Sequence, residues 1–242
     1  MSKKVVVLVD GQNLYYNLHE MGVLEKDIDW TTLFSNIIDS GDELIRAYWF
    51  RPAKILETFF TEEKIVRTIV YKKFKTHLDN YKQGKMDKVP KNVQEQVENE
   101  KKSALTWIGK QKRKFADLEF AYDQLCLVYD DIEMVKTGVV KIDPFKQIYL
   151  GEKGVDISLA VKMISLSVQN KCDKIILVSG DYDYSEAVRF VKDNMTKINV
   201  VKFHKGYPPK SKSMSRDLSI LADKVIDVYE ADLKGKYKKS EE

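Results

Sequence analysis

Short, uninterrupted apolar runs along this chain end on acidic or glycine residues. Val5–Val9 stops at Asp10-Gly11, and Ile175–Val178 stops at Ser179-Gly180-Asp181. Runs of this length without polar alternation are typical of strands buried on both faces of a parallel sheet. The same pattern predicts further strands over Leu44–Phe50, Leu125–Tyr129, Ile132–Val140 and Ile198–Phe203, the second and third of these being one interrupted strand or a hairpin.

Amphipathic stretches separate these runs and predict helices. They begin near Leu14, after Asp29 as an N-cap, at Gly154-Val155-Asp156, and at Asp183, while Leu218–Val228 predicts either a helix or a strand. Strands that alternate with helices indicate an α/β fold with a Rossmann-like parallel sheet. In such sheets ligands bind beyond the carboxyl ends of the strands, where Asp10 and Asp181 fall.

A stretch of different texture interrupts this alternation. Val66, Val70, Phe74 and Leu78 recur every four residues in a lysine-rich segment, and a second amphipathic helix runs from about Val93 into the 120s. We therefore predict an inserted helical hairpin. The expected division is a core of residues 1–58 and 124–232, a helical insertion over 59–123, and a flexible tail over 233–242.

The charge is unevenly distributed along the chain. Residues 64–114 hold fifteen Lys/Arg and five Asp/Glu, a net of +10, so the rest carries −6 against a whole-chain charge of +4. A basic segment attached to an acidic remainder favours nucleic-acid contact by the first and metal binding by the second. The alternative is that long surface helices are simply lysine-rich. The expected phosphate contacts are Lys72, Lys73, Lys75, Lys110, Lys112, Arg113 and Lys114.

Other residue types argue against several classes of protein. Cys126 and Cys172 are far apart and lie in apolar contexts, which predicts buried thiols in a reducing cytoplasm. The apolar runs are shorter than the ~18 residues of a membrane span, so no membrane contact is expected. His19, His77 and His204 occur in unrelated contexts and are predicted at the surface, which disfavours serine or cysteine nucleophile chemistry.

The candidate chemistry lies in the acidic residues. Asp181 and Asp183 stand two residues apart on a strand-to-helix turn, where they repel each other unless a positive charge lies between them. Asp10 follows the first strand with Asn13 close behind, and Asp156 opens a helix. Hard cations such as Mg²⁺ and Mn²⁺ prefer such oxygen ligands. Helix capping is the structural alternative for Asp10, Asp156 and Asp183, although it leaves Asp181 unexplained.

Four segments in order resemble the NYN domain, including its LabA-like branch, in the PIN-like nuclease superfamily. They are Val-Asp-Gly-Gln-Asn-Leu-Tyr-Tyr at 9–16, Lys-Gly-Val-Asp-Ile-Ser-Leu-Ala at 153–160, Leu-Val-Ser-Gly-Asp-Tyr-Asp-Tyr at 177–184, and Leu-Ala-Asp at 221–223. The resemblance covers roughly residues 4–58 and 125–230. Two departures are Tyr184, where the family usually has Phe, and the long basic insertion. Asp223 also matches, but its setting suggests a structural role.

The resemblance implies a PIN-like fold and a metal-dependent ribonuclease, more of the endonuclease type, whose acidic positions match Asp10, Asp156, Asp181 and Asp183. Asn13 and Ser179 would orient ligands or phosphate by hydrogen bonds. We expect phosphodiester hydrolysis with Mg²⁺ or Mn²⁺ in RNA rather than DNA. Two alternatives stay open: a nucleic-acid-binding or regulatory module that cuts little, and a metal-dependent phosphatase. A homodimer or a protein partner is also left open.

Overall fold

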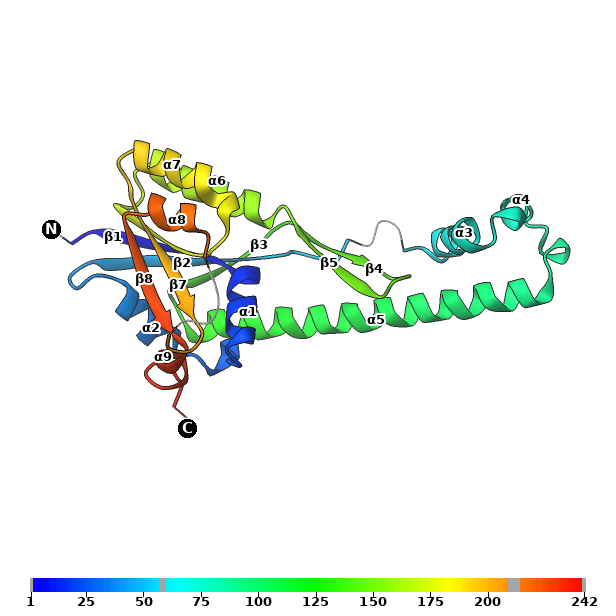
Figure 1. Ribbon diagram of the computed structural model, residues 1–242, viewed down its shortest axis with the longest axis horizontal. Coiled ribbons are helices and arrows are strands. Elements are labelled where there is room, and N and C mark those ends of the chain that lie inside the picture. The colour runs from blue at the N-terminus through cyan, green and yellow to red at the C-terminus, as the bar shows by residue number, and fades with distance from the viewer. Residues whose placement is uncertain (1, 57–59, 209–213, 241–242) are drawn as a thin grey trace. The chain divides into compact units, whose positions relative to one another are not determined.

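The computed structural model describes residues 2–56, 60–208 and 214–240 (Figure 1). The chain divides into two compact units, each considered by itself. The first comprises Met1–Pro52, Ala121–Gly138 and Gly154–Glu242, and the second comprises Ala53–Phe120 and Val139–Lys153. Among the described residues, no helix combines the length and the apolar character needed to cross a bilayer.

The described part of the first unit contains a six-stranded parallel sheet in the order β3-β2-β1-β6-β7-β8. Along the chain, the sheet grows outward from β1 through β2 to β3, then resumes on the other side of β1 with β6. The strand order therefore reverses between β1 and β6, which is where open α/β sheets form their ligand crevice. The strands are β1 (Lys4–Asp10), β2 (Glu43–Arg51), β3 (Ile132–Lys136), β6 (Lys174–Val178), β7 (Lys197–His204) and β8 (Lys224–Tyr229).

Helices cover both faces of this sheet (Figure 1). On one face, α1 (Gly11–Glu20), α2 (Trp30–Ile37) and α9 (Glu230–Lys234) bury residues such as Leu14, Trp30 and Leu233 against the sheet. On the other, α6 (Val155–Val168), α7 (Ser185–Asp193) and α8 (Arg216–Leu221) bury residues such as Leu159 and Val188. Because both faces are covered, β1 and β6 read as continuous apolar runs.

The second unit has its own apolar core. It contains α3 (Glu62–Lys73), α4 (Leu78–Lys82), most of α5 (Lys91–Val128), and an antiparallel pair formed by β4 (Val139–Asp143) and β5 (Ile148–Lys153). Ile65, Ile69, Val97, Ile108 and Ile142 are buried together in this core. The apolar stripe of α3 thus finds its partner within the unit, as amphipathic patterning requires.

The structure confirms the parallel α/β sheet and a long helix in the basic segment, and it corrects details. The predicted strand at Leu125–Tyr129 is wrong, because residues 125–128 form the last turn of α5, where Leu125 packs inward and Leu127 is 75% exposed. One-sided burial of this kind fits helical periodicity rather than a strand covered on both faces. Ile132–Val140 is divided between two sheets, as β3 and the start of β4.

The borders of the two units also differ from the predicted borders at 58 and 124. The β4–β5 hairpin groups with the second unit, because β4 pairs with β5 and bridges Ile55. Alternating, partly exposed residues in β5 gave no apolar run that would mark it as a strand. Residue 59, the predicted start of the insertion, lies outside the described residues.

The predicted flexible tail is wrong as far as Lys239. Tyr237 is buried in the core, its carbonyl accepts from the Asp29 amide at 2.8 Å, and the Lys239 amide donates to the Asp27 carbonyl at 2.8 Å. Residues 241 and 242 lie outside the described part. His204, predicted at the surface, is likewise buried: it stacks on Tyr229 and its Nε2 lies 2.6 Å from an oxygen of Asp227.

Candidate functional site

Asp10 lies at the carboxyl end of β1, at the point where the strand order reverses. Its side chain is buried, and its Oδ1 accepts from the Asn13 amide at 3.0 Å, which caps α1. Its Oδ2 accepts from the hydroxyls of Ser179 at 3.0 Å and Tyr184 at 3.2 Å. Capping therefore explains one oxygen of Asp10, while the other faces the end of β6. A buried carboxylate held by three donors is fixed in position and keeps capacity for a further contact.

Asn13 connects the ends of the two central strands. Its Oδ1 accepts from the Gly180 amide at 3.1 Å and from Asn17 Nδ2 at 2.9 Å. The bond to Gly180 holds the turn after β6 against the start of α1. The side-chain oxygen of Asn13 thus positions the turn that carries Asp181.

Asp181 and Asp183 occupy this turn in different environments. Asp181 is half-buried, and its Oδ1 accepts from the Asp183 amide at 3.0 Å as the N-cap of the short 3-10 helix Tyr182–Tyr184. The Asp181 amide donates to Ser179 Oγ at 3.2 Å, so one hydroxyl contacts both Asp10 and Asp181. Asp183 is exposed. Contrary to the sequence argument, capping applies to Asp181 and not to Asp183.

Asp156 lies in the first turn of α6 and meets Asp10 through Tyr184. The Tyr184 hydroxyl is 3.4 Å from Asp156 Oδ1 and 3.2 Å from Asp10 Oδ2. Burial raises the pKa of Asp156 above its ordinary value, and the negative charges of Asp10, Asp181 and Asp183 raise it further. The four carboxylates are therefore close enough to repel one another electrostatically.

The donor chemistry of this edge suits a hard divalent cation, since carboxylate oxygens surround it and their mutual repulsion is relieved by positive charge. Among the described residues, however, no three acidic, histidine or cysteine side chains are gathered as closely as a preformed metal site requires. Tyr184 separates Asp10 from Asp156, and Asp183 faces solvent. The residues fit the cation in kind, and a small inward movement of side chains would complete a binding set.

Arg51, at the carboxyl end of β2, is a buried charge beside this edge that the sequence argument missed. It pairs with Glu25, and its guanidinium carbon lies 4.4 Å from the ring centre of Tyr122. A Cβ added to Gly11 would lie 2.3 Å from Arg51 Nε and 2.6 Å from the Phe50 carbonyl oxygen. Glycine after Asp10 is thus required by the passage of the Arg51 side chain.

Asp223, assigned a structural role from the sequence, has one. Its Oδ2 accepts from the Ile198 amide at 2.7 Å, and its Oδ1 pairs with Lys192 at 3.3 Å. These contacts join the start of β8 to the start of β7, at the amino ends of the strands and away from Asp10.

The predicted phosphate-contacting residues lie on α3 and α5 and just beyond α3, all in the second unit. Lys73 pairs with Glu100 at 2.7 Å, and Lys72 lies 4.8 Å from the ring centre of Phe145. Lys75 stands beside Tyr71, while Lys110, Lys112, Arg113 and Lys114 are exposed on α5. Part of the basic charge is therefore neutralised locally, and the α5 positions hold most of what faces solvent.

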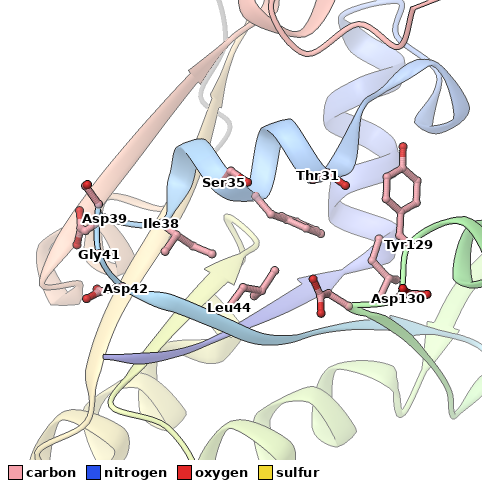
Figure 2. Close-up of a pocket in the computed structure, with 13 residues that line it drawn as sticks. Thr31, Ser35, Ile38, Asp39, Gly41, Asp42, Leu44, Tyr129 and Asp130 are labelled. Carbon is pink, nitrogen blue, oxygen red and sulfur yellow. The ribbon is translucent and has the colours of Figure 1, made fainter. Parts of the chain in front are cut away.

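A separate cavity of about 280 Å³ opens at the amino ends of the strands, between α2 and the starts of β2 and β3 (Figure 2). Asp39, Asp42, Asp130 and Asp131 line it together with apolar residues such as Ile38 and Leu44. Asp39 and Asp42 both bind the buried amine of Lys174, the former at 2.6 Å. These two carboxylates therefore serve a structural ion pair, and the cavity lies at the sheet edge opposite Asp10.

The NYN domain model matches residues 132–230, which include Asp156, Asp181 and Asp183 but not Asp10. No curated protein matches the chain. A solved structure of a Vibrio parahaemolyticus protein of unknown function is similar, with 16% identity, covering 94% of this chain and 93% of that one at a TM-score of 0.47. At that score the likeness supports no argument about this chain.

Proposed function

Because residues 132–230 carry an NYN domain, which is generally a nuclease domain, we propose that this protein is a divalent-metal-dependent endoribonuclease. The supporting observation is the arrangement at the carboxyl ends of β1 and β6. Asp10, Ser179, Asp181 and Asp156 are connected there through shared hydroxyl contacts, at the switch point of a parallel sheet. RNA is preferred to DNA on the family resemblance, and Mg²⁺ or Mn²⁺ on the donor type.

Asp10, Asp156, Asp181 and Asp183 would hold one or two such ions, with Asp10 and Asp181 nearest. When bound, these ions stabilise the charge that develops on the phosphate and the leaving oxygen, and they lower the pKa of the attacking water. The protein itself supplies position. Ser179 fixes an oxygen of Asp10 and the backbone of Asp181, while Asn13 fixes Gly180 between them. Such preorganisation removes the cost of orienting the ligands during reaction.

The deciding experiment is cleavage of labelled single-stranded RNA with Mn²⁺ by the wild type and by Asp10→Asn and Asp181→Asn. We expect both variants to lose activity by at least about a hundredfold, since each removes a charge that nothing nearby replaces. Asp223→Asn is the matched control, because that carboxylate has structural contacts only. Undiminished cleavage by the double variant Asp10→Asn/Asp181→Asn would contradict the assignment.

One observation favours a second candidate, a nucleic-acid-binding module that cuts little. The described carboxylates are not gathered as a ready metal cluster, and Asp183 is exposed. RNA binding in EDTA that is followed by no cleavage in Mn²⁺ would support this module instead. A phosphatase reaction is tested beside it with p-nitrophenyl phosphate. Finer assignments, namely the LabA-like branch, a cytoplasmic location and a homodimer or protein partner, are proposals of lower rank; the two unbridged cysteines fit the reducing location.

A further inference from the structure

The second unit carries a polar groove between α5 and the turn that joins β4 to β5. Its volume is about 340 Å³. Gln147, in the turn, donates from Nε2 to Ser103 Oγ on the helix at 2.9 Å, so one hydrogen bond connects the two walls. The lining consists of amides, hydroxyls, two lysines and one indole: Asn99, Lys102, Ser103, Thr106, Trp107, Lys110 and Gln147.

The two lysines differ from their neighbours in having no counterion. Lys102 and Lys110 are exposed, and within the described chain neither forms an ion pair or a side-chain hydrogen bond. Nearby, Lys73 pairs with Glu100 and Lys101 pairs with Glu98, so the acidic residues of this region are already engaged. The groove therefore holds uncompensated positive charge, which attracts an anion.

The spacing of the lysines specifies the kind of anion. Eight residues along a helix correspond to a rise of about 12 Å. One phosphate group is too small to contact both amines at that separation, whereas a strand with successive phosphates can contact both. Ser103, Thr106, Asn99 and Gln147 add the neutral hydrogen-bonding groups that usually accompany phosphate and sugar contacts.

Trp107 adds a feature that phosphate binding alone does not need. It is half-buried at the groove, between Lys102 and Lys110 in sequence, whereas Trp30 and Trp49 are buried in the core of the first unit. An accessible indole beside a basic groove suits stacking of an unpaired base, which contributes about 1–3 kcal/mol per base in single-strand binding proteins. Bases inside a duplex have no free face for this contact.

We propose that this groove is a binding site for single-stranded RNA, with phosphates on Lys102 and Lys110 and a base on Trp107. The proposal rests on the proposed function for its choice of RNA, and it defines the substrate as single-stranded. It adds residues 102, 107 and 147 to the basic segment, none of which the charge count distinguishes.

Binding is measured with the full chain and a 12-nucleotide single-stranded RNA in EDTA, so that no cleavage occurs, by fluorescence anisotropy and by tryptophan emission. Trp107 dominates quenching by added ligands, since the other two indoles are buried. We expect RNA to quench the wild type, Trp107→Phe to abolish the quenching, and a duplex of the same length to quench little. Equal quenching by the duplex would overturn the single-strand assignment.

The charge contribution is tested with Lys102→Glu/Lys110→Glu. The dissociation constant should rise by at least about tenfold at low salt, and the slope of log K against log[salt] should fall by about 1.4, at 0.7 per phosphate. Lys82→Glu/Lys88→Glu makes the same charge change on exposed residues of the same unit outside the groove, and it should have a smaller effect.

Equal losses in both double variants would overturn the groove as a site and leave only diffuse attraction. Circular dichroism and the melting temperature verify that each variant is folded. Failure of the nuclease proposal is distinguishable: an RNA-quenched protein that never cleaves contradicts the proposed function alone, whereas cleavage without groove-dependent binding contradicts the groove alone.

Discussion

The hydroxyl of Tyr184 lies between Asp10 and Asp156, 3.2 Å from one carboxylate and 3.4 Å from the other. A tyrosine hydroxyl has one hydrogen to donate, so it serves one carboxylate at a time while filling the space between both. Where the resembling family usually has Phe, this chain thus places a hydrogen-bond donor at the centre of its acidic edge.

Tyr184→Phe should destabilise the metal-free protein by about 1–3 kcal/mol, because a buried carboxylate loses a donor. Urea unfolding in EDTA measures the change. Tyr182→Phe is the matched control, since Tyr182 is 53% exposed and should change stability by less than ~0.5 kcal/mol. We further expect Mn²⁺ to raise the melting temperature of Tyr184→Phe by more than that of the wild type, because the unscreened carboxylates gain more from a cation. Equal stabilities and equal Mn²⁺ responses would refute the role of the hydroxyl.

Gly11→Ala should cost about 1–3 kcal/mol or more, because the new methyl group would overlap the Phe50 carbonyl, which belongs to the sheet and cannot move away. Gly109→Ala on α5 is the contrasting substitution. No atom lies within 4 Å of its added Cβ, and alanine favours a helix over glycine by up to about 1 kcal/mol. Urea denaturation should therefore shift in opposite directions for the two variants. A neutral Gly11→Ala would show that Arg51 adapts.

Asp39 should contribute to acid stability. Hydrogen bonds from Lys174 and then Lys224 lower the pKa of Asp39 from 3.8 to about 2. A lowered carboxylate pKa stabilises the fold above the unfolded value and loses that contribution as pH falls through the folded value. The stability difference between the wild type and Asp39→Asn should thus be full above about pH 4 and disappear toward pH 2, as measured by melting temperature against pH. A difference independent of pH would show that packing, and not charge, is responsible.

Cys172 should be unreactive in the folded protein. Burial, with a smaller contribution from the charge of Asp173, raises the pKa of its thiol to about 11, so thiolate is scarce near pH 8. In a Cys126→Ser background, Ellman's reagent should release no colour until denaturant is added. Rapid reaction under native conditions would indicate that the helix layer over Cys172 opens readily.

Much of the central sheet could be predicted because its strands are covered on both faces, and such burial produces unbroken apolar runs, as in Val5–Val9 and Ile175–Val178. The hairpin of β4 and β5 could not, since Ile148, Tyr149 and Leu150 are each substantially exposed and alternate no more clearly than a loop. The tail was misjudged because its polar composition hides one anchoring residue, Tyr237, whose burial depends on a distant partner, Asp29.

For the candidate site, sequence order indicated which strand ends carry acidic groups, because parallel strands share one carboxyl edge. It could not indicate the cross-links between them. The Ser179 hydroxyl shared by Asp10 and Asp181, and the Asn13 contact with Gly180, depend on side-chain direction across neighbouring strands. Arg51 was equally hidden, since a single arginine at a strand end has no periodicity to reveal it. Whether these residues perform catalysis stays a prediction.

The strand order has a consequence for biosynthesis. β2 lies beside β3 in the finished sheet, yet residues 52–131 separate them along the chain. At about 5–20 residues per second, a ribosome needs roughly 4–16 s to add those 80 residues. Throughout that interval the outer edge of β2 has left the ribosome without its partner, and unpaired strand edges are where nascent chains associate wrongly. Binding by a chaperone during this delay would protect the growing chain.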